Sequence, residues 1–87
     1  MSAATAAVTM YSTTWCGYCN RLKTLMKREG IEFAEVDIEV TEGAADIVTQ
    51  ANGGNRTVPT LVFADGSALT NPSLDQVKAQ LAQLPGA

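Results

Sequence analysis

The sequence contains no histidine, and it contains only two cysteines. Without histidine, the chain cannot form the Ser–His or Cys–His pairs that activate many catalytic nucleophiles. The same absence leaves only two soft ligands, which are too few for an ordinary zinc site, so no metal site is expected. These classes of enzyme and zinc protein are therefore disfavoured, and the chemistry of the two thiols becomes the main question.

Charge and long apolar runs are also scarce. Charged residues make up 17% of the chain, and the formal net charge is −3. Binding to nucleic acid depends on dense Lys and Arg, so no nucleic-acid partner is expected. No stretch approaches the roughly 20 apolar residues that cross a bilayer, so no membrane association is expected. Residues 1–7 lack the features of a secretory signal, and we expect a cytoplasmic protein whose thiols stay reduced.

The sequence does contain a regular alternation of strand-like and helix-like segments. With 87 residues the chain is expected to form one domain over residues 8–87, preceded by a flexible tail over residues 1–7. The patterns predict strands over 8–12, 33–38, 60–64 and 67–70, and helices over 19–29, 42–51 and 74–84. The order β-α-β-α-β-β-α predicts an α/β fold with parallel pairs among the first strands and a final hairpin.

Individual residues predict where two of the helices begin and which sides they bury. Thr41 is expected to cap the second helix. Ser73 and Gln76 have the spacing of a capping box at the start of the last helix. The expected inner face of the second helix contains Ile47, Val48 and Ala51. The expected buried face of the last helix contains Leu74, Val77, Leu81 and Leu84.

The two cysteines lie in the run Cys16-Gly17-Tyr18-Cys19, between a predicted strand and a predicted helix. Free N–H groups and the helix dipole favour an anion at a helix start, so the pKa of the Cys16 thiol is expected to be lowered. The thiolate is the species that attacks disulfides. Cys19, one turn further on, is expected to be deeper and to resolve a mixed disulfide on Cys16. The alternative, half of a metal site, would need a second cysteine pair that the chain lacks.

Two other features lie beside the predicted redox pair. Trp15 and Tyr18 flank the cysteines; Trp15 fits a core position and a binding position equally well, whereas Tyr18 favours packing against a bound thiol. Val58 and Pro59 open the third predicted strand. From the residues alone, a cis bond before Pro59 is the minority expectation.

Three segments together resemble the glutaredoxin family: Thr14-Trp15-Cys16-Gly17-Tyr18-Cys19, Arg56-Thr57-Val58-Pro59-Thr60 and Phe63-Ala64-Asp65-Gly66. The resemblance implies a thioredoxin fold, in which three helices flank a four-stranded mixed sheet. It also implies that Cys16 is the nucleophile, that Cys19 is the resolving thiol, and that Pro59 is the family's cis-proline. The Val58 backbone would then pair with the bound thiol.

One departure from the family pattern concerns the small thiol. Glutaredoxins that use glutathione typically carry a Gly-Gly-Cys-Asp type run whose N–H groups hold a glutathione carboxylate, where this chain has Thr70-Asn71-Pro72-Ser73. Proline has no N–H to donate. This run and residues 52–60 most resemble the mycoredoxins, glutaredoxin relatives that use mycothiol, a sugar–inositol thiol. The candidate substrate-binding residues are Trp15, Tyr18, Arg56, Thr57, Val58, Pro59, Thr70 and Asn71.

The resemblance implies an enzyme that reduces mixed disulfides between mycothiol and protein cysteines. No bound cofactor is expected: mycothiol is the co-substrate, and NADPH acts indirectly through mycothione reductase. The expected partners are mycothiol and proteins that are S-mycothiolated or disulfide-bonded, and the chain is expected to be a monomer. One alternative is an electron donor to ribonucleotide reductase recharged by thioredoxin reductase, although the Ser-Gly-Phe-Arg-Pro run typical of such redoxins is absent. Another is an iron–sulfur carrier, a dimer that shares one cluster through Cys16 and a free thiol from each subunit.

Overall fold

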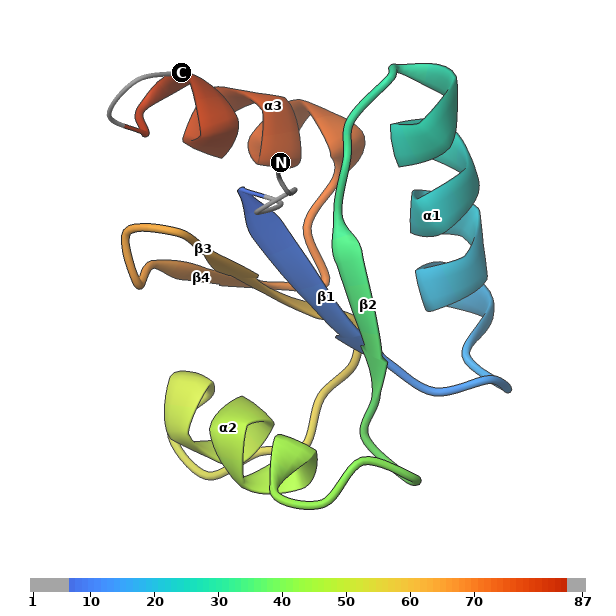
Figure 1. Ribbon diagram of the computed structural model, residues 1–87, viewed down its shortest axis with the longest axis vertical. Helices are drawn as coiled ribbons and strands as arrows, with labels where there is room; N and C mark the ends of the chain where they lie inside the picture. Colours follow the sequence, from blue (N-terminus) through green and yellow to red (C-terminus); the bar gives the residue numbers. More distant parts are fainter. Residues whose placement is uncertain (1–6, 85–87) are drawn as a thin grey trace, which may run out of the picture.

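A four-stranded sheet forms the centre of the molecule in the computed structural model, which describes residues 7–84 (Figure 1). Its strands are β1 (Val8–Ser12), β2 (Ala34–Asp37), β3 (Thr60–Phe63) and β4 (Ala68–Thr70), in the spatial order β2-β1-β3-β4. The helices are α1 (Gly17–Arg28), α2 (Ala44–Ala51) and α3 (Leu74–Ala82). β1 pairs parallel with β2 and antiparallel with β3, and β3 pairs antiparallel with β4. The predicted element order and the mixed sheet are confirmed.

The helices cover both faces of this sheet, with α1 and α3 on one side and α2 on the other (Figure 1). Side chains alternate along β1, so Val8 and Met10 pack against α1 and α3, whereas Tyr11 packs on the α2 side. The larger core lies under α1 and α3 and consists of Val8, Met10, Leu22, Met26, Leu61, Phe63, Val77 and Leu84. A smaller cluster under α2 consists of Ile38, Ala44 and Val48. The loop that leads from β1 into α1 therefore has a packed layer on each side.

α2 differs most from the prediction. It begins at Ala44 after Gly43, whose φ of 80° places it in the left-handed region, and Thr41 does not cap it with a side-chain hydrogen bond. Instead, the Thr41 carbonyl accepts the Ala44 N–H at 3.2 Å. The predicted inner face is correct only for Val48: the buried stripe runs through Ala44 and Val48, four residues apart, whereas Ile47 and Ala51 are exposed.

The start of α3 agrees with the prediction. Ser73 Oγ accepts the Gln76 N–H at 3.2 Å, and Gln76 Oε1 accepts the Ser73 N–H at 2.8 Å, so the capping box is confirmed. Val77 is buried and Leu74 is partly buried. Every predicted strand after the first is one or two residues shorter in the structure.

Residues 1–6 of the expected tail lie outside the described part of the chain, while the Ala7 carbonyl accepts the Ala64 N–H at 2.9 Å. No helix found between residues 7 and 84 has the length and apolar character needed to cross a membrane.

Candidate active site

The two cysteines lie where β1 leads into α1. β1 ends at Ser12, the Thr13 carbonyl accepts the Cys16 N–H at 3.3 Å, and α1 begins at Gly17. Cys16 is therefore the N-cap of α1, and its Sγ accepts the Cys19 N–H at 3.1 Å. Cys16 is 6% exposed, whereas Cys19 is 0% exposed. The expected placement of Cys16 at the helix start and of Cys19 in a deeper position is confirmed, with α1 starting two residues earlier than predicted because Cys16 caps it.

The structure holds Cys16 and Cys19 as a disulfide. The two sulfur atoms are therefore within bonding reach of each other across one helical turn. In the reduced protein, the N–H groups of the first turn of α1 and the helix dipole favour negative charge on the Cys16 sulfur. A group bound to Cys16 through a disulfide can be displaced by Cys19, because the Cys19 sulfur lies within reach of that bond and attacks it once it is deprotonated.

The loop before β3 closes the other side of Cys16. The Val58–Pro59 peptide bond is cis, as the family resemblance implied. The Val58 carbonyl oxygen lies 3.9 Å from Cys16 Sγ, and Pro59 is buried. The Pro59 carbonyl accepts the Asn71 N–H at 2.8 Å, which ties this loop to the segment after β4.

Asn52, at the end of α2, joins this loop to the sheet. Its Nδ2 donates to Thr60 Oγ1 at 2.8 Å, and the Thr60 hydroxyl donates to the Thr57 carbonyl at 2.7 Å. The Thr70 hydroxyl donates to Asn52 Oδ1. The side chain of Thr70, a candidate for substrate binding, is therefore engaged inside the protein. The sequence places Asn52 in the run that resembles the mycoredoxins, but no local pattern predicts these side-chain contacts, which join residues 8 and 18 positions apart.

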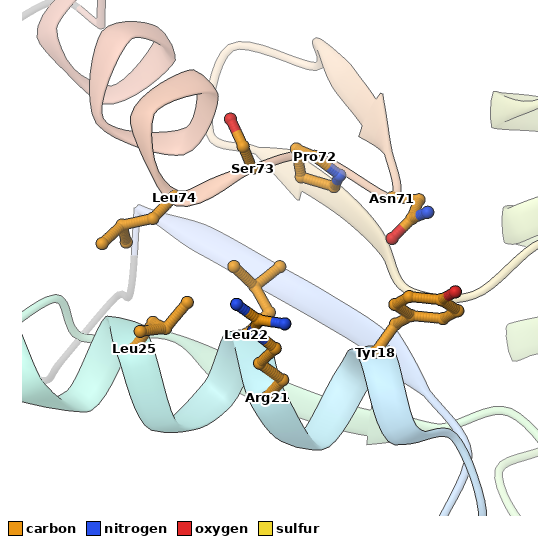
Figure 2. A pocket seen from close by; sticks show the side chains of 8 residues that line it. All are labelled: Tyr18, Arg21, Leu22, Leu25, Asn71, Pro72, Ser73 and Leu74. Atoms are coloured by element: carbon orange, nitrogen blue, oxygen red, sulfur yellow. The ribbon is translucent and has the colours of Figure 1, made fainter.

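Two hollows flank the cysteine pair. The first, here called the α1–α3 groove, lies between α1 and the segment that joins β4 to α3 (Figure 2). Its volume is about 240 Å³. Figure 2 shows Tyr18 and Asn71 at one end of the groove, and Leu25 and Leu74 at the other. It is lined by Tyr18, Arg21, Leu22, Leu25, Asn71, Pro72, Ser73 and Leu74.

The second hollow, here called the Trp15 recess, has a volume of about 250 Å³. Trp15 is 70% exposed, so the core interpretation of this residue is wrong, and its Nε1 donates to Glu39 Oε1 at 3.0 Å. Neither Thr13 nor Glu39 was singled out from the sequence, since nothing in the surrounding residues marks them. The recess is lined by Thr13, Trp15, Ile38, Glu39, Arg56 and Val58.

The candidate substrate-binding residues are thus divided between the two sides of Cys16. Trp15, Arg56 and Val58 line the Trp15 recess, while Tyr18 and Asn71 line the α1–α3 groove. Thr57 contributes its carbonyl to the Asn52 network. Over residues 7–84, no three His, Cys, Asp or Glu side chains gather in a way that could hold a metal ion.

The backbone nitrogens of residues 71–73 are already occupied. The Asn71 N–H donates to the Pro59 carbonyl at 2.8 Å, and the Ser73 N–H donates to Gln76 Oε1 at 2.8 Å. Pro72, between them, has no N–H. None of these three positions therefore offers a backbone donor to a bound carboxylate.

Comparison with known proteins gives three findings. The family model named Glutaredoxin matches residues 8–68. A protein of Mycobacterium tuberculosis whose name assigns it provisionally to the glutaredoxins is 60% identical over 82 residues, covering 94% of this chain and 98% of that protein. Mycoredoxin 1 of Corynebacterium glutamicum is 40% identical over 77 residues, covering 88% of this chain and 95% of that protein.

Among solved structures, the glutaredoxin of Archaeoglobus fulgidus superposes with a TM-score of 0.74 at 26% identity, covering 90% of this chain and 88% of that one. The agreement extends over nearly the whole described structure. It confirms the thioredoxin fold expected from the sequence.

Proposed function

The chain belongs to the glutaredoxin family and is a thiol–disulfide oxidoreductase whose redox pair is Cys16 and Cys19, and we propose that it reduces mixed disulfides between protein cysteines and mycothiol. The observation that carries the proposal is the absence of an available backbone donor at residues 71–73. The 40% identity to a protein named Mycoredoxin 1 supports it.

The γ-glutamyl carboxylate of glutathione distinguishes the two small thiols at this place. Glutathione-using relatives hold the γ-glutamyl carboxylate of glutathione with backbone N–H groups at this place. Here the Asn71 and Ser73 N–H groups already have acceptors, and Pro72 has no N–H. A carboxylate placed beside them would lose its hydration without gaining hydrogen bonds, which is costly for a charged group. Mycothiol lacks this γ-glutamyl group, so it loses nothing at this position.

The proposed reaction proceeds by two exchanges of thiol and disulfide. The Cys16 thiolate attacks the mycothiol sulfur of the mixed disulfide, and the bond to the client cysteine breaks. The client leaves as a thiolate and takes a proton, while mycothiol stays bonded to Cys16. A second mycothiol thiolate then attacks, which releases mycothiol disulfide and restores the Cys16 thiolate. A flavin- and NADPH-dependent reductase returns the mycothiol disulfide to two thiols, so the electrons come from NADPH.

The first test compares small thiols. One peptide is prepared as a mixed disulfide with mycothiol and as a mixed disulfide with glutathione, and each is assayed with its own thiol and reductase. We expect a higher kcat/KM for the mycothiol substrate. Equal or greater activity on the glutathione substrate would contradict the proposal.

The second test separates the roles of the two cysteines. Reduction of a small-thiol mixed disulfide needs one attacking sulfur, so Cys19→Ser should retain activity on an S-mycothiolated peptide. Reduction of a disulfide within a protein needs a second sulfur to release the client, so the same variant should lose it. Cys16→Ser should abolish both activities. If folded Cys19→Ser protein loses activity on the S-mycothiolated peptide, both cysteines are needed for each reaction. That result would favour the alternative function, an electron donor to ribonucleotide reductase.

A further inference from the structure

The Trp15 recess is lined by two residues that contact Cys16. Val58 lines the recess, and its carbonyl oxygen lies 3.9 Å from Cys16 Sγ. Thr13 also lines it, and the Thr13 carbonyl holds the Cys16 N–H at 3.3 Å. A small thiol bonded to Cys16 can therefore extend its adjoining group into this recess. The volume of about 250 Å³ leaves room for one six-membered ring.

The walls of the recess carry charges of both signs. Glu39 Oε1 accepts the Trp15 indole N–H at 3.0 Å, which fixes the carboxylate beside the exposed indole ring. Arg56 also lines the recess and supplies a guanidinium group. Within residues 7–84, neither Glu39 nor Arg56 forms an ion pair. The recess therefore offers hydrogen-bond acceptors and donors together, and its net charge is close to zero.

A second observation points to a ligand. Thr13 is 3% exposed, and its Oγ1 has no hydrogen-bond partner among the described residues. A buried hydroxyl without a partner costs free energy, so such a group calls for an explanation. The hydroxyl is covered in this conformation, so the side chain must rotate about χ1 for the hydroxyl to meet a ligand in the recess. A hydroxylated ligand in the recess would give it a partner.

We propose that the Trp15 recess binds a neutral, polyhydroxylated ring of the small thiol, and that Glu39 makes it a poor site for a carboxylate. The inference rests on the proposed function and assigns the residues that recognise the thiol. Ring hydroxyls can donate to Glu39, accept from Arg56 and pair with Thr13, while the apolar face of the ring packs on Trp15. A carboxylate gains from Arg56 but is repelled by Glu39, so it obtains little net attraction.

The experiment measures kcat/KM for the mycothiol and glutathione mixed disulfides of one peptide in four proteins: wild type, Glu39→Gln, Thr13→Val and Glu42→Gln. Glu39→Gln keeps an oxygen for the Trp15 N–H and removes the charge, so kcat/KM for the glutathione substrate should rise about threefold to tenfold. Thr13→Val should lower kcat/KM for the mycothiol substrate roughly threefold to tenfold, which is the effect of one lost hydrogen bond. Its unfolding midpoint should not fall, since the lost hydroxyl has no partner in the protein.

Glu42→Gln is the matched control, because Glu42 is exposed and does not line the recess. It should leave the ratio of the two kcat/KM values unchanged. High salt should change wild-type activity on the glutathione substrate little, because the attraction of Arg56 and the repulsion of Glu39 are screened together. It should lower the activity of Glu39→Gln on that substrate, because only the attraction of Arg56 remains to be screened.

Two outcomes are distinguishable. A wild-type protein without preference for the mycothiol substrate contradicts the proposed function. The recess assignment is overturned, and the proposed function is not, if the preference persists unchanged in both Glu39→Gln and Thr13→Val. The same conclusion follows if each variant affects both substrates equally. An equal effect would place the client protein, and not the small thiol, in the recess.

Discussion

Replacing Asn52 with alanine should loosen the loop that faces Cys16. The Asn52 amide donates to Thr60 Oγ1 at 2.8 Å and accepts the Thr70 hydroxyl, and it makes a longer contact of 3.5 Å to the Thr57 carbonyl. These contacts join α2, β3, β4 and the residues before Pro59. Asn52→Ala removes all of them at once, without removing a large apolar side chain.

The size of the effect follows from the contacts. Two good hydrogen bonds are lost, and each contributes about 1 kcal/mol net. Thr60 is 0% exposed but still donates to the Thr57 carbonyl at 2.7 Å, so its hydroxyl is not left without any partner. We therefore expect a loss of about 2 kcal/mol in the free energy of unfolding. For a domain of this size, that corresponds to a Tm lower by about 10 °C.

Urea and thermal unfolding of the oxidised protein measure this loss, with Asn55→Ala as the control. Asn55 is exposed and makes one contact of 3.5 Å, to the Asn52 carbonyl, so its replacement should change the stability by less than about 0.5 kcal/mol. An Asn52→Ala protein that is as stable as Asn55→Ala would refute the reasoning. The activity of Asn52→Ala, measured well below its Tm, should also fall, because the network positions the loop that carries Val58.

Three further predictions concern other parts of the molecule. In the reduced wild type at neutral pH, Cys16 should be alkylated faster than Cys19, because Cys16 caps α1 whereas Cys19 is fully buried. Mass spectrometry of timed samples measures the order, and faster alkylation of Cys19 would contradict this prediction. Ser73→Ala should lower the free energy of unfolding by about 1 kcal/mol in urea titrations, through loss of the α3 cap, and an unchanged midpoint would contradict this. The hydrogen bond from Lys23 holds the pKa of Glu35 below its usual value, so the stability from this pair is present at neutral pH and is lost as the pH falls through the lowered pKa. In Glu35→Gln, the free energy of unfolding should therefore fall less steeply as the pH is lowered into the acid range. The difference from wild type should be less than about 1 kcal/mol, because the pair is partly exposed.

Local signals in the sequence were sufficient for the element order and for the redox pair. The alternation of Val8 to Ser12 and the capping box at Ser73 each depend on residues close together in the chain, and both are confirmed. The position of Cys16 at a helix start follows in the same way from a strand that ends just before it. The start of α2 was missed because Gly43 and the Thr41 carbonyl, rather than a side-chain cap, determine where that helix begins.

The surroundings of the redox pair depend on contacts that no local pattern encodes. Glu39 meets Trp15 across 24 positions of the sequence, and Asn52 meets Thr70 across 18. Both contacts exist only because the sheet brings the end of β2 and the end of α2 near the β1–α1 loop and β4. The family resemblance supplied the residues that match its motifs, but Thr13 and Glu39 lie outside them, and the run that begins at Asn52 did not reveal the contacts of its side chain.

The outer edges of the sheet determine whether another extended chain can add to it as a strand. β2 forms one edge and carries Glu35 and Asp37, whose charges discourage a foreign strand from pairing there. β4 forms the other edge; it is only three residues long and is followed by Asn71, with φ of 47°, and Pro72. Neither edge is a long, flat template for strand addition. Each edge therefore offers little backbone with which another extended chain could pair.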